Sequence, residues 1–150
     1  MATEYKTLAH RWFDEVWNKG RAEVIDELFA DDGIARGLTD VAGNDLRGPA
    51  EFKPFFHSFR AAFPDLQVTV EDTVAEGDKL AARCTVRATH AGEGIGLAAT
   101  NLPVAFTGMC ILRVKDGRIV EAWNNFDFMS MFQQVGAIKA IPPPDAGGSV

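Results

Sequence analysis

The sequence predicts an α+β domain in which a bent antiparallel sheet of four or more strands wraps over three N-terminal helices. Up to residue 63 the apolar residues recur mainly at helical spacing. From residue 66 onward they alternate with polar residues, as in half-buried strands. The Asp116-Gly117 pair separates two such alternating segments and is typical of a two-residue hairpin turn. Helices followed by a run of strands are the pattern of α+β folds.

Three helices are expected in the N-terminal part. The first begins near Thr3, a good capping residue, and stops at Asn18-Lys19-Gly20. The second is short and carries Ile25, Leu28 and Phe29 on one side. The third opens at Gly48-Pro49, because proline suits the first helical turn, and it ends before Pro64. Its apolar stripe comprises Phe52, Phe55, Phe56, Phe59, Ala62 and Phe63.

The remaining residues are expected to form strands and loops. Residues 34–47 are interpreted as a short strand plus a loop, and the Gly- and Ala-rich residues 91–103 as a loop. The expected main strands are Leu66–Ala75, Leu80–His90, Val104–Val114 and Arg118–Phe128, followed by a short helix at Met129–Val135. One domain is therefore predicted over residues 1–138, with a mobile Pro- and Gly-rich tail at 139–150.

Counting outward from a two-residue loop at Asp116-Gly117 predicts which side chains of the last hairpin share a face. The expected cross-strand pairs are Cys110 with Trp123, Gly108 with Asn125 and Phe106 with Asp127, on one face with Leu112 and Glu121. The other face carries Met109, Ile111, Val120, Ala122 and Phe126. Since both faces are apolar, we expect one to cover the helices and the other to pack against a second copy in a homodimer.

Asp127 is the main catalytic candidate. A carboxylate among aromatic side chains is costly when ionised, so its pKa is expected to rise. Such a group can act as a general acid or base near neutral pH. Trp123, Asn125, Phe106 and Cys110 would then line its pocket. The alternative is that Asp127 caps the helix that follows it, for which aspartate is well suited.

Other residues are secondary candidates. His90 ends its strand and is expected to carry a proton or orient a substrate, or else to be a structural histidine. Arg83 faces Asp72 if Gly77-Asp78 is a turn, so it forms a cross-strand ion pair or holds an anionic substrate group. Glu121 is expected at the pocket edge. Phe59 is expected in the core or in the pocket wall.

The composition limits the classes of partner. The net charge of −6 and the pI of about 5.0 argue against binding nucleic acid or an anionic membrane surface. Two cysteines, in no Cys/His cluster, give no zinc-binding pattern. The sequence has no secretory signal pattern and no apolar run long enough to span a bilayer, so a cytoplasmic location is expected.

Four stretches of the sequence carry a resemblance to a known family: RWFDEVWNKG at 11–20, FRAAFPDLQV at 59–68, VAEGDKLAARCTVRATHAGE at 74–93 and FTGMCILRVKDGRIVEAWNNFDFMSMFQQVG at 106–136. They resemble the SnoaL-like polyketide cyclase family, and in particular its ester cyclase branch, within the nuclear-transport-factor-2-like superfamily. The most specific match is Trp123, Asp127 and the closing Gln134-Val135-Gly136.

The resemblance implies a cone-shaped barrel and a chemistry that needs no cofactor or metal. In the antibiotic-pathway cyclases of this family, the aspartate at the position of Asp127 removes a proton next to a carbonyl, and the enolate closes a ring. The cyclases carry a histidine where this chain has Cys110.

Three functions are therefore considered. The first is an acid/base cyclase, lyase or isomerase acting on a small hydrophobic carbonyl compound, with Asp127 as general base. The second is a non-catalytic protein that binds a hydrophobic ligand. The third is a protein-interaction module of the same fold. The fold alone does not decide among them.

Overall fold

The computed structural model describes residues 2–40 and 42–139. Its helices are α1 (Ala2–Arg11), the π-helix η1 (Trp12–Asn18), α2 (Ala22–Leu28), α3 (Gly48–Ala62) and α4 (Phe128–Gln134). Its strands are β1 (Phe29–Thr39), β2 (Asp45–Arg47), β3 (Gln67–Glu76), β4 (Lys79–Thr89), β5 (Pro103–Lys115) and β6 (Arg118–Phe126). The predicted tail lies outside the described residues from residue 140 onward. Phe29, which helical spacing assigns to the second helix, instead begins β1.

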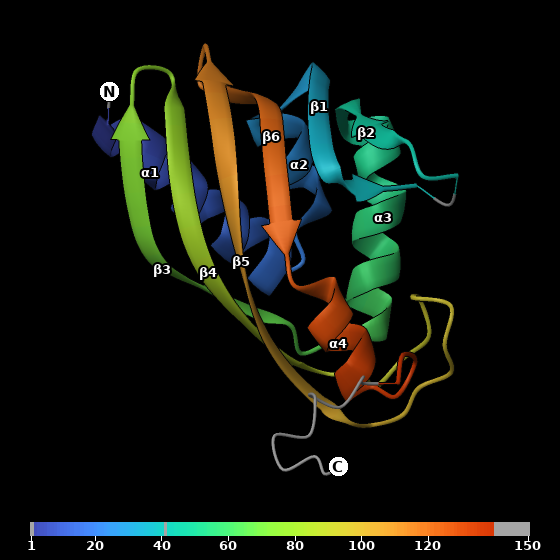
Figure 1. Cartoon of the computed structure of the whole chain (residues 1–150). Coiled ribbons are helices and arrows are strands. Elements are labelled where there is room, and N and C mark those ends of the chain that lie inside the picture. Colours follow the sequence, from blue (N-terminus) through green and yellow to red (C-terminus); the bar gives the residue numbers. More distant parts are fainter. Residues whose placement is uncertain (1, 41, 140–150) are drawn as a thin grey trace, which may run out of the picture.

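The six strands form one curved sheet in the order β2-β1-β6-β5-β4-β3. Neighbouring strands are antiparallel, except that β1 and β6 are parallel. The helices α1 and α2 lie behind the sheet, α3 stands beside β1 and β2, and α4 lies at the end where β6 finishes (Figure 1). The predicted α+β class is confirmed, and the one parallel pair makes the sheet mixed.

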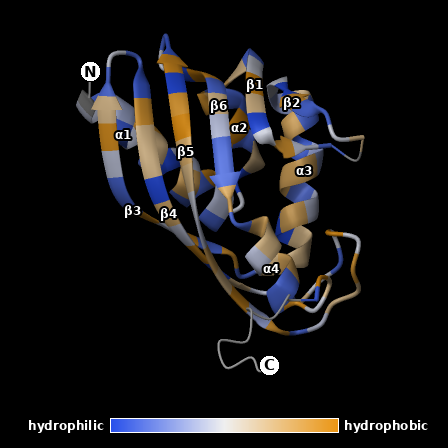
Figure 2. Ribbon diagram, viewed as in Figure 1, coloured by the Kyte–Doolittle hydropathy of each residue, from blue (hydrophilic) through white to orange (hydrophobic). Residues whose placement is uncertain are grey.

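The concave face of the sheet and the helices share one apolar core. Every second residue of β4 and β5 is buried, as the pleat of a strand requires. Figure 2 shows hydrophilic residues between hydrophobic ones along β4, whereas part of β5 is hydrophobic without interruption. The phenylalanines of α3 meet the tryptophans of η1, with the Trp17 ring centroid 5.3 Å from that of Phe56 and 5.9 Å from that of Phe59. These edge-to-face contacts hold α3 across the open side of the curved sheet.

The first predicted helix changes its winding half-way. From Trp12 onward it is a π-helix, and the Lys19 N–H donates to the carbonyl of Asp14, five residues earlier, at 2.9 Å. The wider turn lets four large side chains of this segment be buried together: Trp12, Phe13, Val16 and Trp17. π-helical turns are uncommon and often occur at functional sites.

The predicted turn of the last hairpin is correct, but the predicted pairing beyond it is wrong by one residue. Lys115 pairs with Arg118 and Val114 with Ile119, after which Arg113 pairs with Glu121. Val120 is therefore the extra residue of a β-bulge. Because side chains alternate with a period of two, the slip moves every later residue of β6 to the opposite face.

The corrected pairs reverse the two faces. Gly108 lies opposite Phe126, Cys110 opposite Asn124 and Ile111 opposite Trp123. The inner residues of β6 are therefore Ala122, Asn124 and Phe126, and the outer ones are Trp123, Asn125 and Asp127. Gly108 leaves no empty space, because a Cβ atom there would lie 2.1 Å from the Phe126 ring.

The cost of burying Glu121 gives a physical reason for the bulge. Without it, Glu121 would follow Ile119 into the core, where an unpaired carboxylate is strongly unfavourable. The bulge turns Glu121 outward, where its carboxylate accepts from Arg36 at 2.7 Å and from Arg113 at 3.2 Å. The hydrogen bond from Arg36 is the main cause that lowers the pKa of Glu121.

Candidate functional site

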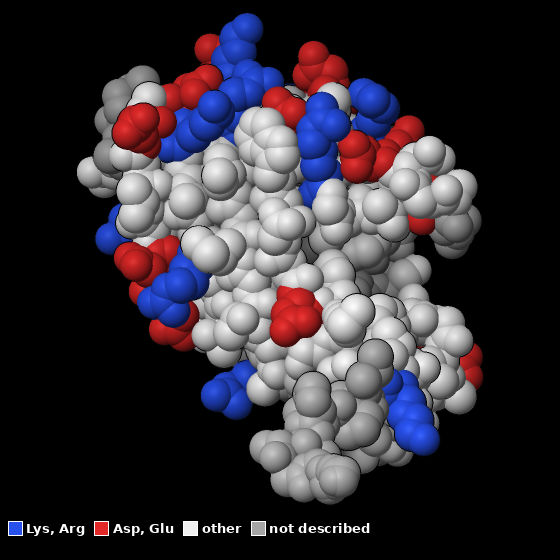
Figure 3. All heavy atoms as spheres, viewed as in Figure 1, with Lys and Arg blue, Asp and Glu red and all other residues white. Residues whose placement is uncertain are grey.

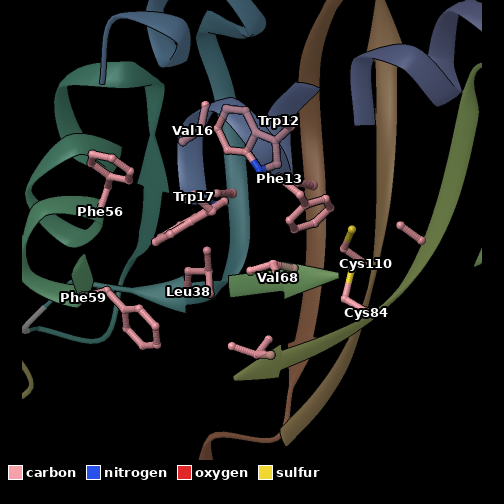
Figure 4. Packing of buried hydrophobic residues seen from close by; sticks show 14 of the residues in the cluster. Trp12, Phe13, Val16, Trp17, Leu38, Phe56, Phe59, Val68, Cys84 and Cys110 are labelled. Atoms are coloured by element: carbon pink, nitrogen blue, oxygen red, sulfur yellow. The ribbon is translucent and has the colours of Figure 1, made fainter. Parts of the chain in front are cut away.

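A cavity lies inside the cone, between α3, η1 and the concave face of the sheet. Figure 4 shows Trp12, Trp17, Phe13 and Phe59 directed into this region. The enclosed cavity has a volume of about 60 Å³, and the space between the walls is about 650 Å³ when the open mouth is counted. The aromatic side chains therefore nearly close the cavity. Its walls are Trp12, Phe13, Trp17, Phe29, Ala35, Leu38, Phe52, Phe55, Phe59, Leu66, Val68, Val86, Phe106, Leu112, Ile119, Ala122, Asn124, Phe126 and Phe128.

The mouth of the cavity lies where α4 approaches α3. A second hollow shares Leu38, Phe55, Phe59 and Phe128 with the cavity and continues outward past Gly94 and Ile95 of the loop between β4 and β5. The ring centroids of Phe59 and Phe128 are 6.0 Å apart across this opening. A ligand that enters by this route must displace one of these rings.

The Gln134 side chain holds α4 in place over the mouth. Its Oε1 accepts from the N–H of Ala105 at 2.8 Å, and its Nε2 donates to the carbonyl of the same residue at 2.9 Å. Nε2 also donates to the Ser130 hydroxyl at 2.8 Å. The Gln134 amide thus pairs with the backbone of β5 beyond the end of β6, as the backbone of a neighbouring strand would. This gives a physical role to the glutamine of the closing Gln134-Val135-Gly136 motif.

Asn124 is the wall residue that carries an amide, and besides the indole N–H groups of Trp12 and Trp17 it supplies the polar atoms of the wall side chains. Its Nδ2 donates to the Arg36 carbonyl at 2.9 Å, which fixes the amide orientation. Gly37 has a φ of +82°, and a Cβ atom there would lie 2.0 Å from the Asn124 carbonyl oxygen, so only glycine allows this close approach. Among the described wall residues there is no carboxylate, histidine, lysine or arginine.

Asp127 lies outside the cavity. Its side chain is exposed, and Oδ1 accepts from the Ser130 N–H at 3.0 Å, so Asp127 caps α4. Its backbone N–H donates to the Thr107 carbonyl, and it lines an open depression on the outer face with Arg83, Met109 and Asn125. The expectation of Asp127 in an apolar pocket is therefore wrong, because the bulge at Val120 turns it outward.

His90 is buried beneath the loop between β4 and β5. Its Nδ1 lies 3.0 Å from the Thr100 hydroxyl, and its ring packs on Phe63 with 5.5 Å between centroids. Backbone hydrogen bonds join it to Leu102 and Asn101. Nε2 has no hydrogen-bond partner among the described residues. His90 therefore links the two ends of this loop through hydrogen bonds, and it is not a wall residue of the cavity.

The remaining candidates divide between the two faces. Phe106 and Phe59 are cavity walls, whereas Trp123, Asn125, Arg83 and Glu121 belong to the outer side of the sheet. Arg83 pairs in register with Asp72, as the Gly77-Asp78 turn predicts, but no ion pair joins them.

Cys110 faces Asn124 across the hairpin and is buried behind the cavity wall. Burial raises the pKa of its thiol to about 12, and that of Cys84 on the neighbouring strand to about 11. Both therefore act as apolar core residues rather than as nucleophiles.

The described residues contain no group of three His, Cys, Asp or Glu side chains placed to hold a metal ion. Within the same part of the chain, every helix is too short or too polar to cross a membrane.

The comparisons with known proteins agree with this fold. The model of the SnoaL-like polyketide cyclase family matches residues 7–135. The chain belongs to this family. It matches no curated protein sequence.

Three solved structures illustrate the likeness. IdmH of Streptomyces antibioticus, a proposed polyketide cyclase, is 34% identical with a TM-score of 0.75, over 87% of this chain and 97% of that one. AclR of Streptomyces galilaeus, a proposed hydroxylase, is 29% identical with a TM-score of 0.78, over 95% and 87% of the two chains. A protein of Catenulispora acidiphila with a ketosteroid isomerase-like fold is 19% identical with a TM-score of 0.69, over 86% and 92%, and shares the fold.

The sequence interpretation missed Asn124, because the residue belongs to the inner face only after the bulge. A signal was nevertheless present. Regular alternation from Ile119 would have buried the carboxylate of Glu121, and that conflict predicts an irregularity between these two residues.

Proposed function

We propose that this member of the SnoaL-like family binds a small hydrophobic carbonyl compound inside its cone, with Asn124 as the polar contact. The observation that carries the proposal is the wall chemistry: aromatic and aliphatic side chains surround a single carboxamide. Such a pocket gains free energy by removing apolar ligand surface from water, while one polar group sets the orientation.

The Asn124 amide suits a carbonyl or enol oxygen. One Nδ2 hydrogen is donated to the Arg36 carbonyl, and among the described residues the second hydrogen and Oδ1 have no partner. Because the amide is already oriented, little side-chain entropy is lost when a ligand binds it. An amide hydrogen bond also stabilises charge that develops on a carbonyl oxygen, so the same contact would assist ring closure of a folded carbonyl chain.

The test is a binding titration followed by tryptophan fluorescence. Trp12 and Trp17 are wall residues, whereas Trp123 lies on the outer side, so a Trp123→Phe variant reports only the cavity. Decalone, a bicyclic ketone, is compared with its parent hydrocarbon decalin. One hydrogen bond of about 1 kcal/mol predicts that the ketone binds about fivefold more tightly. Equal affinities, or no binding of either compound, would reject the proposal.

Acid/base catalysis by Asp127 is the second candidate function, and family membership favours it. It requires a substrate that reaches the outer end of β6, since the Asp127 carboxylate is exposed there and caps α4. Asp127→Asn keeps the cap and removes the base. Loss of ring closure in this variant, with ligand binding intact, would support this function; unchanged ring closure would reject it.

A further inference from the structure

The loop between β4 and β5, residues 90–102, forms one side of the cavity mouth. Its Gly94 and Ile95 line the hollow that leads outward past Phe59. Two of its glycines lie against α3, since a Cβ atom at Gly92 or Gly94 would come within 2.0 Å of a carbonyl oxygen of that helix. Figure 1 shows this segment reaching from the lower end of the sheet to the end of α3. We call residues 90–102 the mouth loop, and its position sets the width of the mouth.

Hydrogen bonds at His90 hold the mouth loop in this position. The His90 N–H donates to the Leu102 carbonyl at 2.9 Å, and the His90 carbonyl accepts from the Asn101 N–H at 2.8 Å. The ring adds a further link, because Nδ1 lies 3.0 Å from the Thr100 hydroxyl and accepts from the Thr100 N–H at 3.4 Å. Asn101 has a φ of +58°, which is uncommon for a residue other than glycine. The loop is thus closed by a few hydrogen bonds, and the one from the Thr100 N–H requires an unprotonated Nδ1.

The surroundings of the His90 ring suit a neutral imidazole. The side chain is fully buried and packs on Phe63, and its Nε2 has no hydrogen-bond partner among the described residues. A protonated ring carries a hydrogen on each nitrogen, so Nδ1 would direct a donor at the Thr100 N–H while Nε2 stayed unpaired. A buried cation without a partner is strongly unfavourable.

The acidic residues around this end of the molecule do not compensate such a cation. No carboxylate of the described residues forms an ion pair with His90. Asp65, which follows α3, is engaged elsewhere, because its Oδ1 accepts from a backbone N–H of β4 at 2.7 Å. Glu93, in the mouth loop itself, is exposed.

The other elements packed around the ring add little charge. Arg60 of α3 donates to the backbone of η1, and Arg87 of β4 is exposed. Neither α4 nor residues 103–112 of β5 carry a charged side chain. On the face that Figure 3 shows, charged side chains gather mainly toward the upper end and the left edge, and few lie near α4. Burial and hydrogen bonding therefore decide which charge state of His90 the closed loop accepts.

From these observations we propose that His90 is a proton-sensitive latch on the cavity mouth. While the ring is neutral, its hydrogen bonds hold the mouth loop against α3. When the ring takes up a proton, the closed position loses the bond from the Thr100 N–H and gains an uncompensated buried charge, so the loop moves outward until water reaches the ring. Histidine is the side chain that ordinarily changes charge between about pH 5 and about pH 8. The mouth is therefore narrow at neutral pH and widens as the solution is acidified.

The sign and the largest size of this effect follow from proton linkage. The open position binds one proton more than the closed position, so lowering the pH favours the open one. One proton changes the ratio of open to closed molecules by at most about tenfold for each pH unit. A ligand held behind the mouth loop would exchange faster in acid whatever its chemistry, so this inference is independent of the compound proposed for the cavity.

Hydrogen exchange of the full chain, followed by mass spectrometry, tests the latch. The protection factors of residues 91–102 are compared with those of β4 at about pH 7.5 and about pH 5.5. Acidification should lower the protection of the mouth loop by up to about tenfold per pH unit and leave that of β4 nearly constant. Equal protection of the mouth loop at both pH values would overturn the proposal.

Two variants identify the histidine that is responsible. The chain has three histidines, and the other two, His10 and His57, are exposed. The double variant His10→Gln/His57→Gln leaves His90 as the only imidazole and should keep the pH dependence. His90→Gln carries an amide that does not titrate, so its protection should be equal at both pH values whether or not its loop stays closed. A dependence that is lost in the double variant, or kept in His90→Gln, would contradict the assignment.

Acrylamide quenching of tryptophan fluorescence tests whether the mouth loop controls access to the cavity. In the Trp123→Phe protein the fluorescence comes from Trp12 and Trp17, which line the cavity. Quenching by this small neutral molecule should increase on acidification, and the increase should vanish when His90→Gln is added. A mouth loop that loses protection in acid without any increase in quenching would overturn its role at the mouth.

Discussion

Replacing Asn124 by aspartate should make the stability of this protein depend on pH. The substitution changes one amide into a carboxyl group of nearly the same shape. That group would lie among the apolar cavity walls and beside the Arg36 carbonyl, which currently accepts from Nδ2. A neutral carboxyl can donate to this carbonyl, whereas a carboxylate is repelled by it. Both effects raise the pKa of the introduced group in the folded state.

The size and sign of the change in stability follow from the difference between the folded-state and unfolded-state pKa values of the introduced carboxyl group. Position 124 is partly exposed, so we take a shift of about one to two pKa units above the ordinary value of about 3.9. At pH values below the ordinary pKa of about 3.9, the carboxyl group is protonated in both the folded and the unfolded state, so it costs little stability. As the pH rises the unfolded chain ionises first, so stability is lost until the folded-state pKa is passed. At about 1.36 kcal/mol per unit, the loss is about 1.4 to 2.7 kcal/mol.

Urea denaturation from about pH 4 to about pH 8 measures this loss as a difference from the wild type. Asn125→Asp is the matched control, because Asn125 directly follows Asn124 in the sequence but is exposed on the outer side. The difference should grow with pH for Asn124→Asp and stay flat for Asn125→Asp. A pH-dependent loss in the Asn125 variant, or in neither, would refute the bulge at Val120 and the inner position of Asn124.

Two further predictions concern the elements around the cavity. Gln134→Ala removes both hydrogen bonds to Ala105 and should lower the free energy of unfolding by about 1 to 2 kcal/mol. Gln133→Ala, whose side chain forms no hydrogen bond with the described residues, should leave it nearly unchanged in the same denaturation assay. Cys84 and Cys110 should resist a maleimide at pH 8 in the native protein and react once it is unfolded, because burial raises the pKa of these thiols to about 11 and about 12. Native labelling at the rate of the unfolded chain would contradict the buried positions.

The sequence predicts the elements well because their signals are local. Pro49 and Pro64 mark the two ends of α3, and the Asp116-Gly117 turn joins β5 and β6 as its chemistry requires. These signals depend on a few neighbouring residues, so tertiary contacts do not override them.

The site is less predictable because it depends on three features that no local sequence signal indicates. The bulge at Val120 contains no glycine that would indicate it in the sequence. This bulge determines whether Asp127 or Asn124 faces the cavity. The parallel pairing of β1 with β6, which supplies the Arg36 carbonyl to Asn124, joins residues far apart in the sequence. The π-helical winding of η1 is a third such feature, since Trp12 with Val16 and Phe13 with Trp17 are four residues apart, as on one face of an ordinary helix.

The most direct test of the account measures decalone binding in two variants of the Trp123→Phe protein. Asn124→Leu fills the same position without a hydrogen-bonding group, and Asp127→Asn removes the carboxylate while keeping the cap on α4. The account predicts that Asn124→Leu abolishes the preference for the ketone over decalin and that Asp127→Asn leaves it unchanged. A preference that survives in Asn124→Leu and is lost in Asp127→Asn would contradict it.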